Sequence, residues 1–406
     1  MKIDEYLQKS SEYLNKLCSV KPNRRTGSIG NRAATDFFYE TVKTWGYEID
    51  TKSFSCLDFE RGEASLACNG NFFEIHISPY SLGCDISTEL VTISTIGELE
   101  KCHCTGKILL MKGEVCAEQL MPKNFVFYNP SHHQKIYHLL EERKPEAIIT
   151  VTARNPELVG ALYPFPLIED GDFDIPSVYC TDVVGKEIAA FASGKIHLNI
   201  QAKRIHSTSC NVIMRKNTNY KKKIIICAHI DAYGDSPGAL DNASGTVVLL
   251  LIADMLRRIN SAIGIEIIAF NGEDNFSAGG ELDYLKRYAK ELEKILMVIN
   301  IDDVGFKNGK NALSLYGCPK MISEKAKDIF LGYKGIIHGE QWFQGDHMIF
   351  TQKNIPAIAF TSEKMKELLM SVTHTSNDVP ELVDCKKLIE LADAIKGFIS
   401  EMREYN

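Results

Sequence analysis

The stretch KIIICAHIDAYGDSPGALDNASGTVVLLLIADML, residues 223–256, combines two structural signals. Its first part, Ile224–Ala228, is a continuous apolar run with the length of a strand that is buried on both faces. After a turn-rich stretch, Ala243–Ile259 is long and apolar enough for a buried helix. A buried strand followed by a helix is the repeating unit of α/β proteins.

The same alternation continues towards the C-terminus. We expect further strands at Ile265–Phe270, Ile295–Ile301 and Ile355–Thr361, and further helices at Ser277–Lys290, Ile322–Tyr333 and Cys385–Glu404. Strands that are joined by helices run parallel, and such a sheet needs cover on both faces. The pattern therefore predicts an α/β fold with a mostly parallel, mixed central sheet and helices on both faces.

Two further regions precede this pattern. Apolar residues at helical spacing predict helices over Ile3–Leu17 and Ile29–Trp45, the second with Ser28 as N-cap and Gly46 as stop. From residue 57 to 204 the sequence changes to short strands and turns, which indicates a smaller α+β or β-rich domain. We expect a discontinuous main domain, 1–56 and 205–406, with 57–204 inserted. The elements expected in the insertion are strands Lys107–Met111, Glu146–Val151 and Pro176–Tyr179 and helices His132–Glu142 and Val183–Phe191.

The composition is that of a globular protein, with 45% hydrophobic and 24% charged residues. A formal net charge of −7 argues against nucleic acid and anionic membranes as main partners. The longest apolar run, Val247–Ala253, is much shorter than the roughly 20 residues of a membrane span, and the charged N-terminus lacks the apolar core of a signal peptide. The twelve cysteines follow no framework spacing and are expected to be reduced, mostly buried thiols. We therefore expect a cytoplasmic location, and the oligomeric state stays open.

Residues of the kind that bind metal ions follow three of the predicted strands within a few positions. They are His229 and Asp231, Glu273 and Asp274, and Asp302. Two more such residues are Asp241, just before the first helix, and His374, in the loop after the last strand. Because the functional crevice of an open α/β sheet lies beyond the carboxyl ends of its strands, these side chains should converge. Clustered carboxylates repel one another unless cations compensate them, so the sequence predicts a site for zinc-type divalent metals.

Each of these residues has an ordinary explanation when taken alone. A histidine after a strand is commonly structural, Asp241 followed by Asn242 would serve as an N-cap, and Glu273-Asp274 would make a solvated turn. Their joint placement at successive strand ends favours the metal site.

The order of these residues resembles that of the co-catalytic zinc peptidase family related to aminopeptidase Y and glutamate carboxypeptidase II. The matching motifs are His229-x-Asp231, Pro237-Gly-Ala-x-Asp241-Asn-x-x-Gly245, Gly272-Glu273-Asp274, Asn300-x-Asp302 and His374-Thr-x-x-Asp378. Asp346-His347-x-x-Phe350, followed by Ile355-Pro356, is similar to the penultimate segment of the family. The resemblance extends from about Asn211 to the C-terminus and includes the N-terminal helices.

The resemblance implies a zinc-dependent aminopeptidase, a metallo-exopeptidase that hydrolyses N-terminal residues of peptides. It implies two divalent metal ions, expected to be zinc. One metal would be bound by His229 and Asp302 and the other by Asp274 and His374, and Asp241 would bridge both.

The same resemblance implies the catalytic roles. Glu273 would be the general base that acts on a metal-bridged water, and Asp231 would orient His229 through its free ring nitrogen. Asp346 and His347 would help to position the substrate.

Two positions depart from the family pattern. The family usually has glutamate where this chain has Asp274, so this ligand is one methylene shorter. Many members carry tyrosine before the last histidine, where Thr373 stands here, so the donor to the oxyanion is unassigned.

The insertion is similar to the protease-associated domain of some relatives. The likeness is carried by Lys107–Gly113, by Pro145-Glu-Ala-Ile-Ile and by Ile175-Pro-Ser-Val. Such a domain would shape access to the site.

Other activities on the same fold stay open. Glutaminyl cyclase-like aminoacyl transfer with a single zinc and zinc carboxypeptidase activity are the alternatives. Relatives that bind a C-terminal glutamate use arginines between the aspartate ligand and the last histidine. The stretch 303–373 contains no arginine, which favours the N-terminal end of the substrate. A non-catalytic receptor-like relative is disfavoured because all inferred ligands and the base are present.

Three further motifs are weak. Gly234-Asp-Ser236-Pro-Gly238 fits a serine hydrolase elbow, but Pro237 lacks the N–H that the elbow uses as oxyanion donor. The stretch 102–104, Cys-His-Cys, has no partner pair at zinc-finger spacing and is expected to be ordinary strand. His132 and His133 are expected to face solvent.

Overall fold

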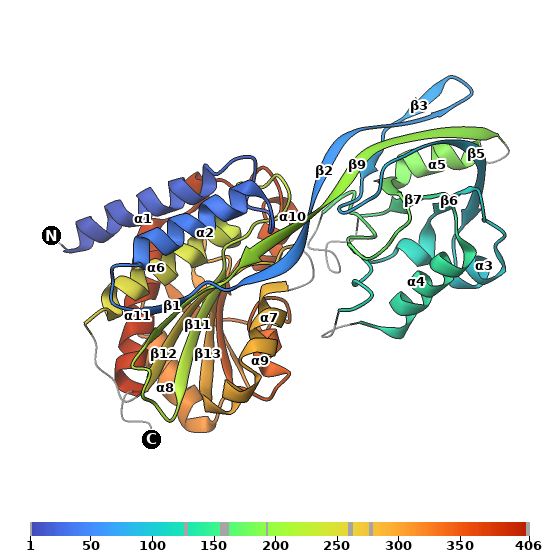
Figure 1. The fold of residues 1–406 in the computed structure, drawn as a ribbon. Coiled ribbons are helices and arrows are strands. Elements are labelled where there is room, and N and C mark those ends of the chain that lie inside the picture. Colours follow the sequence, from blue (N-terminus) through green and yellow to red (C-terminus); the bar gives the residue numbers. More distant parts are fainter. Residues whose placement is uncertain are drawn as a thin grey trace. The chain divides into compact units, whose positions relative to one another are not determined.

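The computed structural model describes residues 2–125, 129–154, 162–191, 194–258, 263–275 and 279–402. The chain forms two compact units. The main unit comprises Met1–Cys56 and Ser207–Asn406, and the inserted unit comprises Leu57–His206. The chain enters the inserted unit along β2 (Ser53–Cys68) and leaves it along β9 (Lys195–Cys210) (Figure 1).

The main unit is built on an eight-stranded sheet of order β1-β10-β12-β11-β13-β16-β14-β15. Its centre consists of four parallel neighbours, namely β12 (Gly264–Phe270), β11 (Lys223–His229), β13 (Ile295–Ile301) and β16 (Ala357–Ser362). On the flanks, β10 (Val212–Lys216) and β14 (Asn311–Tyr316) pair antiparallel with this centre. β1 (Glu48–Asp50) and β15 (Ile336–His338) form the edges. The predicted mixed sheet with a parallel centre is confirmed.

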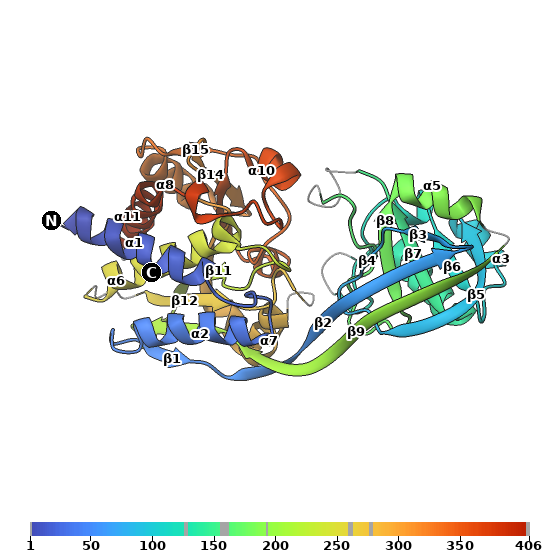
Figure 2. The same ribbon diagram turned by 90° about the horizontal axis from the view of Figure 1, so that it is seen from above.

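Helices cover both faces of this sheet. One face shares a core with α1 (Lys2–Cys18), α2 (Ile29–Val42), α6 (Gly245–Leu256), α8 (Lys320–Phe330) and α11 (Cys385–Glu401) (Figure 1, and from above in Figure 2). On the other face, Tyr284 of α7 (Gly279–Arg287) packs edge-on against Phe270 and against Phe350 of α9 (Met348–Thr351). The remaining short elements are η2 (Ala239–Ser244), η3 (Ala289–Lys294), α10 (Met365–Ser371) and η4 (Pro380–Leu382).

The stretch from η2 through α6 is the most apolar helical segment of the main unit. Ala239–Leu256 is long and apolar enough to cross a membrane by length and composition, so the expectation that no segment reaches this length is wrong. The stretch is 89% buried inside the fold, where it packs as a core helix against β11, β12 and α11.

Most predicted elements of the main unit are present, with shifted ends. The side chain of Ser28 accepts a hydrogen bond from the Asn31 amide, as expected of an N-cap, and the helix ends at Val42, before the expected Trp45. Ser277, Ile259 and Glu404, at three predicted helix ends, lie outside the described residues.

The inserted unit contains a second eight-stranded sheet, of order β3-β2-β9-β5-β6-β7-β8-β4. Its other elements are β3 (Asn71–Phe73), β4 (His76–Ile77), β5 (Cys84–Ile93), α3 (Ile96–Lys101), β6 (Ile108–Met111), η1 (Gly113–Cys116), α4 (Ser131–Arg143), β7 (Ala147–Thr152), β8 (Ser177–Thr181) and α5 (Asp182–Ala190). β2 and β9 have 16 residues each, so the expectation of short strands is wrong there. Both strands alternate buried and exposed side chains over much of their length. Their sequences therefore contain many polar residues and resemble turns, which hides the strands in the sequence.

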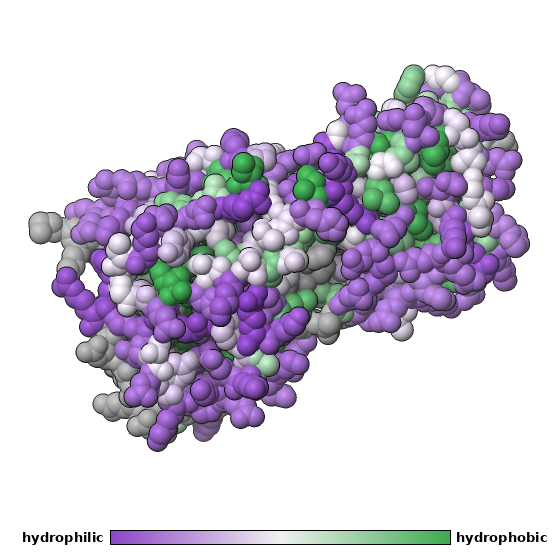
Figure 3. Space-filling model, viewed as in Figure 1, coloured by the Kyte–Doolittle hydropathy of each residue, from purple (hydrophilic) through white to green (hydrophobic). Residues whose placement is uncertain are grey.

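In Figure 3, apolar side chains on the visible face form small, separate patches on a mainly polar surface. All twelve cysteines are free thiols; seven are buried and five are partly buried.

Candidate metal centre

The predicted ligands lie at the carboxyl ends of the four parallel strands. His229 is the last residue of β11, and Asp302 directly follows β13. Glu273 and Asp274 lie in the turn after β12, Asp241 lies in η2, and His374 follows α10, a short helix that the sequence did not predict. Because these strands are neighbours in one sheet, their ends meet at one edge.

Asp241 is the centre of the group. Its Oδ1 lies 3.1 Å from Nε2 of His229, and its Oδ2 lies 2.9 Å from Nε2 of His374. Nε2 of His229 is also 3.3 Å from Oδ1 of Asp302, and Nε2 of His374 is 2.9 Å from Oδ1 of Asp274. The five residues thus form two groups of donor atoms that share Asp241, one oxygen to each.

The charges in this cluster are unbalanced without a cation. Among the described residues, the two imidazoles are the only ion-pair partners of Asp241, Asp274 and Asp302. Oδ2 of Asp274 is buried without a hydrogen-bond partner. Burial, and next the charge of Asp241, raise the pKa of Asp274 to about 6. Imidazole and carboxylate groups in this number and spacing suit zinc-type divalent ions, so the residues present fit the implied metals.

Glu273 lies beside this group without joining it. Its Oε2 is 4.0 Å from Nε2 of His229, farther than any of the ligand contacts. Burial, together with the charges of Asp274 and Asp302, raises the pKa of Glu273 well above its usual range. A carboxylate in such surroundings is a stronger proton acceptor than an exposed glutamate.

The cluster opens to solvent on one side. The side chains of His374 and Glu273 are 25% and 20% exposed, whereas that of His229 is 1% exposed. Tyr233, in the loop after β11, stacks on the ring of His374 with centroids 4.6 Å apart. A substrate would therefore reach the cluster from the side of His374 and Glu273. Sequence reasoning did not single out Tyr233, because a lone tyrosine in a loop gives no signal.

Asp231 holds the turn that carries Glu273. Its Oδ1 accepts a hydrogen bond from the Gly272 amide at 3.0 Å, and its Oδ2 accepts one from the Asn275 side chain at 3.2 Å. Nδ1 of His229 is 3.7 Å from Oδ1 of Asp231, which is longer than a hydrogen bond. Gly272 has a φ of +104°, and a Cβ there would lie 2.9 Å from the Gly279 amide nitrogen, so the turn requires glycine.

Asp346 and His347 lie beneath the surface. His347 is fully buried, and its ring nitrogens contact the Asn300 side-chain amide and the Trp342 carbonyl, each at 3.2 Å. Burial lowers the pKa of His347 to about 4, so the ring is neutral. Asp346 is 1% exposed. A direct contact of either residue with substrate, as expected from the sequence, would require the cover above it to open.

Ser236 has a local structural role. Its Oγ accepts a hydrogen bond from the Gly238 amide at 3.0 Å, and no histidine among the described residues hydrogen-bonds it. A serine nucleophile needs an adjacent base, so this geometry does not support the serine hydrolase alternative.

A second group of metal-type residues lies in the inserted unit. Nε2 of His132 and of His133 contact the same oxygen of Glu118, at 2.7 and 2.9 Å. His133 is fully buried, so the expectation that it faces solvent is wrong. Its Nδ1 accepts a hydrogen bond from the Met121 amide at 3.2 Å, so the neutral ring carries its proton on Nε2. That nitrogen then donates to Glu118 and has no lone pair for a metal.

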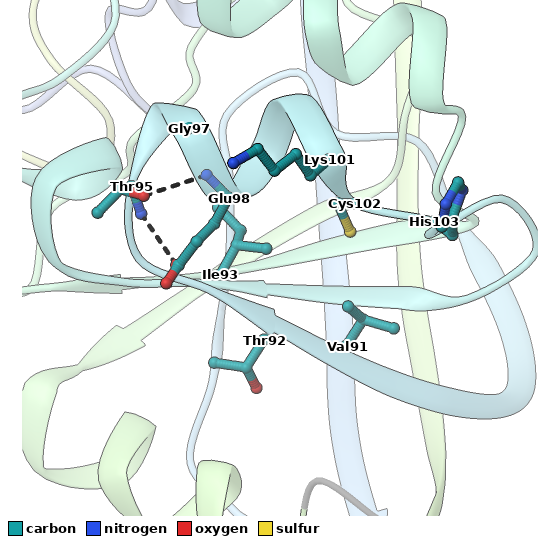
Figure 4. A pocket seen from close by; sticks show the side chains of 9 residues that line it. All are labelled: Val91, Thr92, Ile93, Thr95, Gly97, Glu98, Lys101, Cys102 and His103. Atoms are coloured by element: carbon teal, nitrogen blue, oxygen red, sulfur yellow. Dashed lines mark hydrogen bonds between the residues drawn. The ribbon is translucent and has the colours of Figure 1, made fainter.

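An open hollow of about 580 Å³ lies on the inserted unit next to α3 (Figure 4). Glu98 is the carboxylate that lines this hollow. It accepts hydrogen bonds from the Ser94 and Thr95 amides and so belongs to the N-terminal cap of α3. Nearby, burial raises the pKa of the fully buried Cys104 to about 12, so this thiol stays protonated. Residues 102–104 lie in the loop between α3 and β6, so the expectation that they are ordinary strand is wrong.

Comparisons with known proteins agree with the chemistry of the main unit. Residues 211–399, which contain all the predicted ligands, match the model of peptidase family M28. The chain is 26% identical over 365 residues to leucine aminopeptidase 2 of Arthroderma otae. The aligned region covers 82% of this chain and 68% of that protein.

Solved structures share the fold over nearly the whole chain. An aminopeptidase from Aneurinibacillus sp. strain AM-1 matches with a TM-score of 0.77 and 21% identity, covering 97% of this chain and 93% of the other. BSAP, a zinc aminopeptidase from Bacillus subtilis, matches with a TM-score of 0.74 and 19% identity, covering 98% and 95%. Residues 211–399 are thus similar to peptidase family M28, and the chain as a whole shares the fold of these aminopeptidases.

Proposed function

We propose that this protein is a zinc-dependent aminopeptidase that releases N-terminal residues from peptides. The observation that carries the proposal is the position of Asp241, whose two oxygens face the imidazoles of His229 and His374 separately. One carboxylate placed between two histidines suits a pair of metal ions better than a single ion. The similarity to a leucine aminopeptidase supports the substrate class.

In this proposal the five ligands form two groups, one for each metal, as their contacts with one another indicate. His229 and Asp302 hold one metal, His374 and Asp274 hold the other, and Asp241 binds both. With Glu273, the carboxylates carry a charge of −4 beside neutral imidazoles, which two divalent cations would balance. Two such ions, when bound, supply a water of lowered pKa and polarise the peptide carbonyl.

Glu273 acts as the general base in this proposal. It takes the proton of the attacking water and passes it to the leaving amine. Its distance from His229 leaves it outside the ligand set, and its partial exposure places it at the open side, where the substrate arrives.

The direction of cleavage follows from the charges at this opening. Glu273, whose side chain is 20% exposed at this opening, attracts a protonated α-amine. A C-terminal carboxylate would be repelled, and the stretch 303–373 contains no arginine that could bind it bidentately. The free N-terminus of a peptide is therefore the preferred end.

The test uses metal-free protein that is reloaded with zinc. We expect hydrolysis of Leu-Gly-Gly only with zinc, and little or no hydrolysis of N-acetyl-Leu-Gly-Gly. Equal cleavage of both peptides would overturn the aminopeptidase assignment. Conversion of an N-terminal glutamine peptide to its pyroglutamyl form, without hydrolysis of Leu-Gly-Gly, would favour the glutaminyl cyclase alternative. Full activity without any bound transition metal would overturn the metal-dependent mechanism.

A further inference from the structure

The segment 237–241, which leads into the central ligand Asp241, is held by two buried charged residues from distant parts of the chain. Arg24 lies between α1 and α2 and is 2% exposed. Asp378 lies shortly after His374 and has no exposed surface. Burying a charge is unfavourable unless it is fully hydrogen-bonded, so their contacts need a structural reason.

Arg24 donates hydrogen bonds to backbone carbonyl oxygens of this segment. Its Nη1 donates to the Pro237 carbonyl at 2.6 Å, and its Nη2 donates to the Gly238 carbonyl at 2.8 Å. Its Nε donates to the Ile230 carbonyl at 3.1 Å, just after the ligand His229. The planar guanidinium thus ties the end of β11 to the turn before Asp241, which the single ammonium of a lysine could not do.

Asp378 accepts hydrogen bonds from backbone amides of the same segment. Its Oδ1 accepts a hydrogen bond from the Leu240 amide at 2.8 Å, and its Oδ2 accepts one from the Asp241 amide at 3.0 Å. The backbone carbonyl of Asp378 accepts a further bond from the Ala239 amide at 3.2 Å. Both carboxylate oxygens are therefore occupied by the backbone of the ligand and its neighbour.

Asp241 needs an accurately placed backbone. Its two oxygens must meet two different imidazoles, at 3.1 and 2.9 Å, so one shift of the main chain would disturb both contacts. The turn itself allows little adjustment, since Gly238 has a φ of +61° and a Cβ there would lie 2.5 Å from the Asp241 carbonyl oxygen.

We propose that Arg24 and Asp378 are positioning residues of the metal centre. They hold residues 237–241 from both sides, so that Asp241 can present one oxygen to each metal. This inference rests on the proposed metal pair. It makes the loop between α1 and α2, which lies outside the segment that matches the peptidase family, part of the machinery that sets metal affinity.

The test compares Asp378→Asn with the matched control Asp384→Asn. Asparagine keeps the shape of aspartate, but its oxygen can accept only one of the two amides, and its NH₂ group faces the other. Asp384 caps α11 by accepting a hydrogen bond from the Lys386 amide at 2.9 Å and makes no such bond to residues 237–241. Both variants lose a backbone cap, but only the first alters the support of Asp241.

The readouts are zinc affinity, by competition with a chromophoric chelator, and the visible spectrum of the cobalt-loaded protein. Measurements are made on protein whose circular dichroism shows it to be folded. We expect Asp378→Asn to bind zinc about 10–100-fold more weakly, with an altered cobalt spectrum, and Asp384→Asn to match the wild type. Wild-type affinity and spectrum in folded Asp378→Asn would overturn the inference.

Two further outcomes are informative. If Asp378→Asn does not fold, Arg24→Lys is measured in the same way; we expect weakened zinc binding, and wild-type binding would overturn the inference. If the wild-type protein itself binds no zinc, the proposed function fails. A wild type that binds two metals, with unchanged affinity in these variants, would remove only the positioning role.

Discussion

Replacing Glu273 by glutamine separates proton transfer from metal binding. The amide has nearly the shape of the carboxylate, but it cannot accept a proton from water at neutral pH. Oε2 of Glu273 is 4.0 Å from the nearest ligand nitrogen, on His229, and the side chain is 20% exposed, so neither the ligand set nor the core should rearrange.

The expected loss follows from this single missing group. A positioned general base contributes about 10²–10⁴-fold, so turnover of Glu273→Gln should fall by that factor. This corresponds to about 3–5 kcal/mol of transition-state stabilisation. The wild-type rate should also fall in acid as Glu273 takes up a proton and can no longer accept one from water. The pH–rate profile of Glu273→Gln should lack this decrease in acid.

The assay measures kcat, KM and zinc content of Glu273→Gln beside those of Asp274→Asn. The first variant should keep its zinc and lose turnover, whereas the second should lose zinc, because Asp274 lies 2.9 Å from His374 within the ligand set. Near-wild-type turnover of Glu273→Gln at full zinc content would show that another group is the base.

Glu266→Ala should lower the free energy of unfolding in urea by about 3–5 kcal/mol, because it removes the buried carboxylate that lies 3.1 Å from the fully buried ammonium of Lys223. Glu291→Ala, which removes a 37% exposed carboxylate 3.3 Å from the same ammonium, should cost less than about 1 kcal/mol; equal losses would contradict this reasoning. Gly272→Ala should lose stability by about 1–3 kcal/mol in thermal unfolding and also lose activity, since its φ is +104°. Zinc affinity, measured by chelator competition, should fall from neutral to mildly acidic pH, because a protonated imidazole has no lone pair to donate; a pH-independent affinity would exclude histidine ligands.

The clustering of the candidate ligands could be predicted from sequence because of where these residues lie. His229 and Asp302 end or follow strands that are neighbours in a parallel sheet, and the apolar runs of those strands are unmistakable. Once the strands are parallel, their carboxyl ends must meet, and the side chains that follow them must converge.

The supporting contacts could not be predicted in this way. Asp231 bonds the turn of Gly272, and Arg24 bonds carbonyls more than 200 positions away, and neither contact leaves a periodic or motif signal. The position of His133 was misjudged because the first turn of a helix is usually exposed, whereas here its ring is bound by Glu118 and the Met121 amide.

The short flanking strands were also missed. β1 and β15 have three residues each, too few for a periodic pattern, and they form only because longer neighbours offer unpaired backbone groups. Edge strands of this kind are fixed by tertiary contacts and not by their own sequence.

The most direct test of the metal pair is an anomalous difference map from zinc-loaded crystals. The account predicts two peaks, about 3.5–4 Å apart, on either side of the Asp241 carboxylate. One peak should contact His229 and Asp302, and the other His374 and Asp274. A single peak, or zinc bound away from Asp241, would contradict the account.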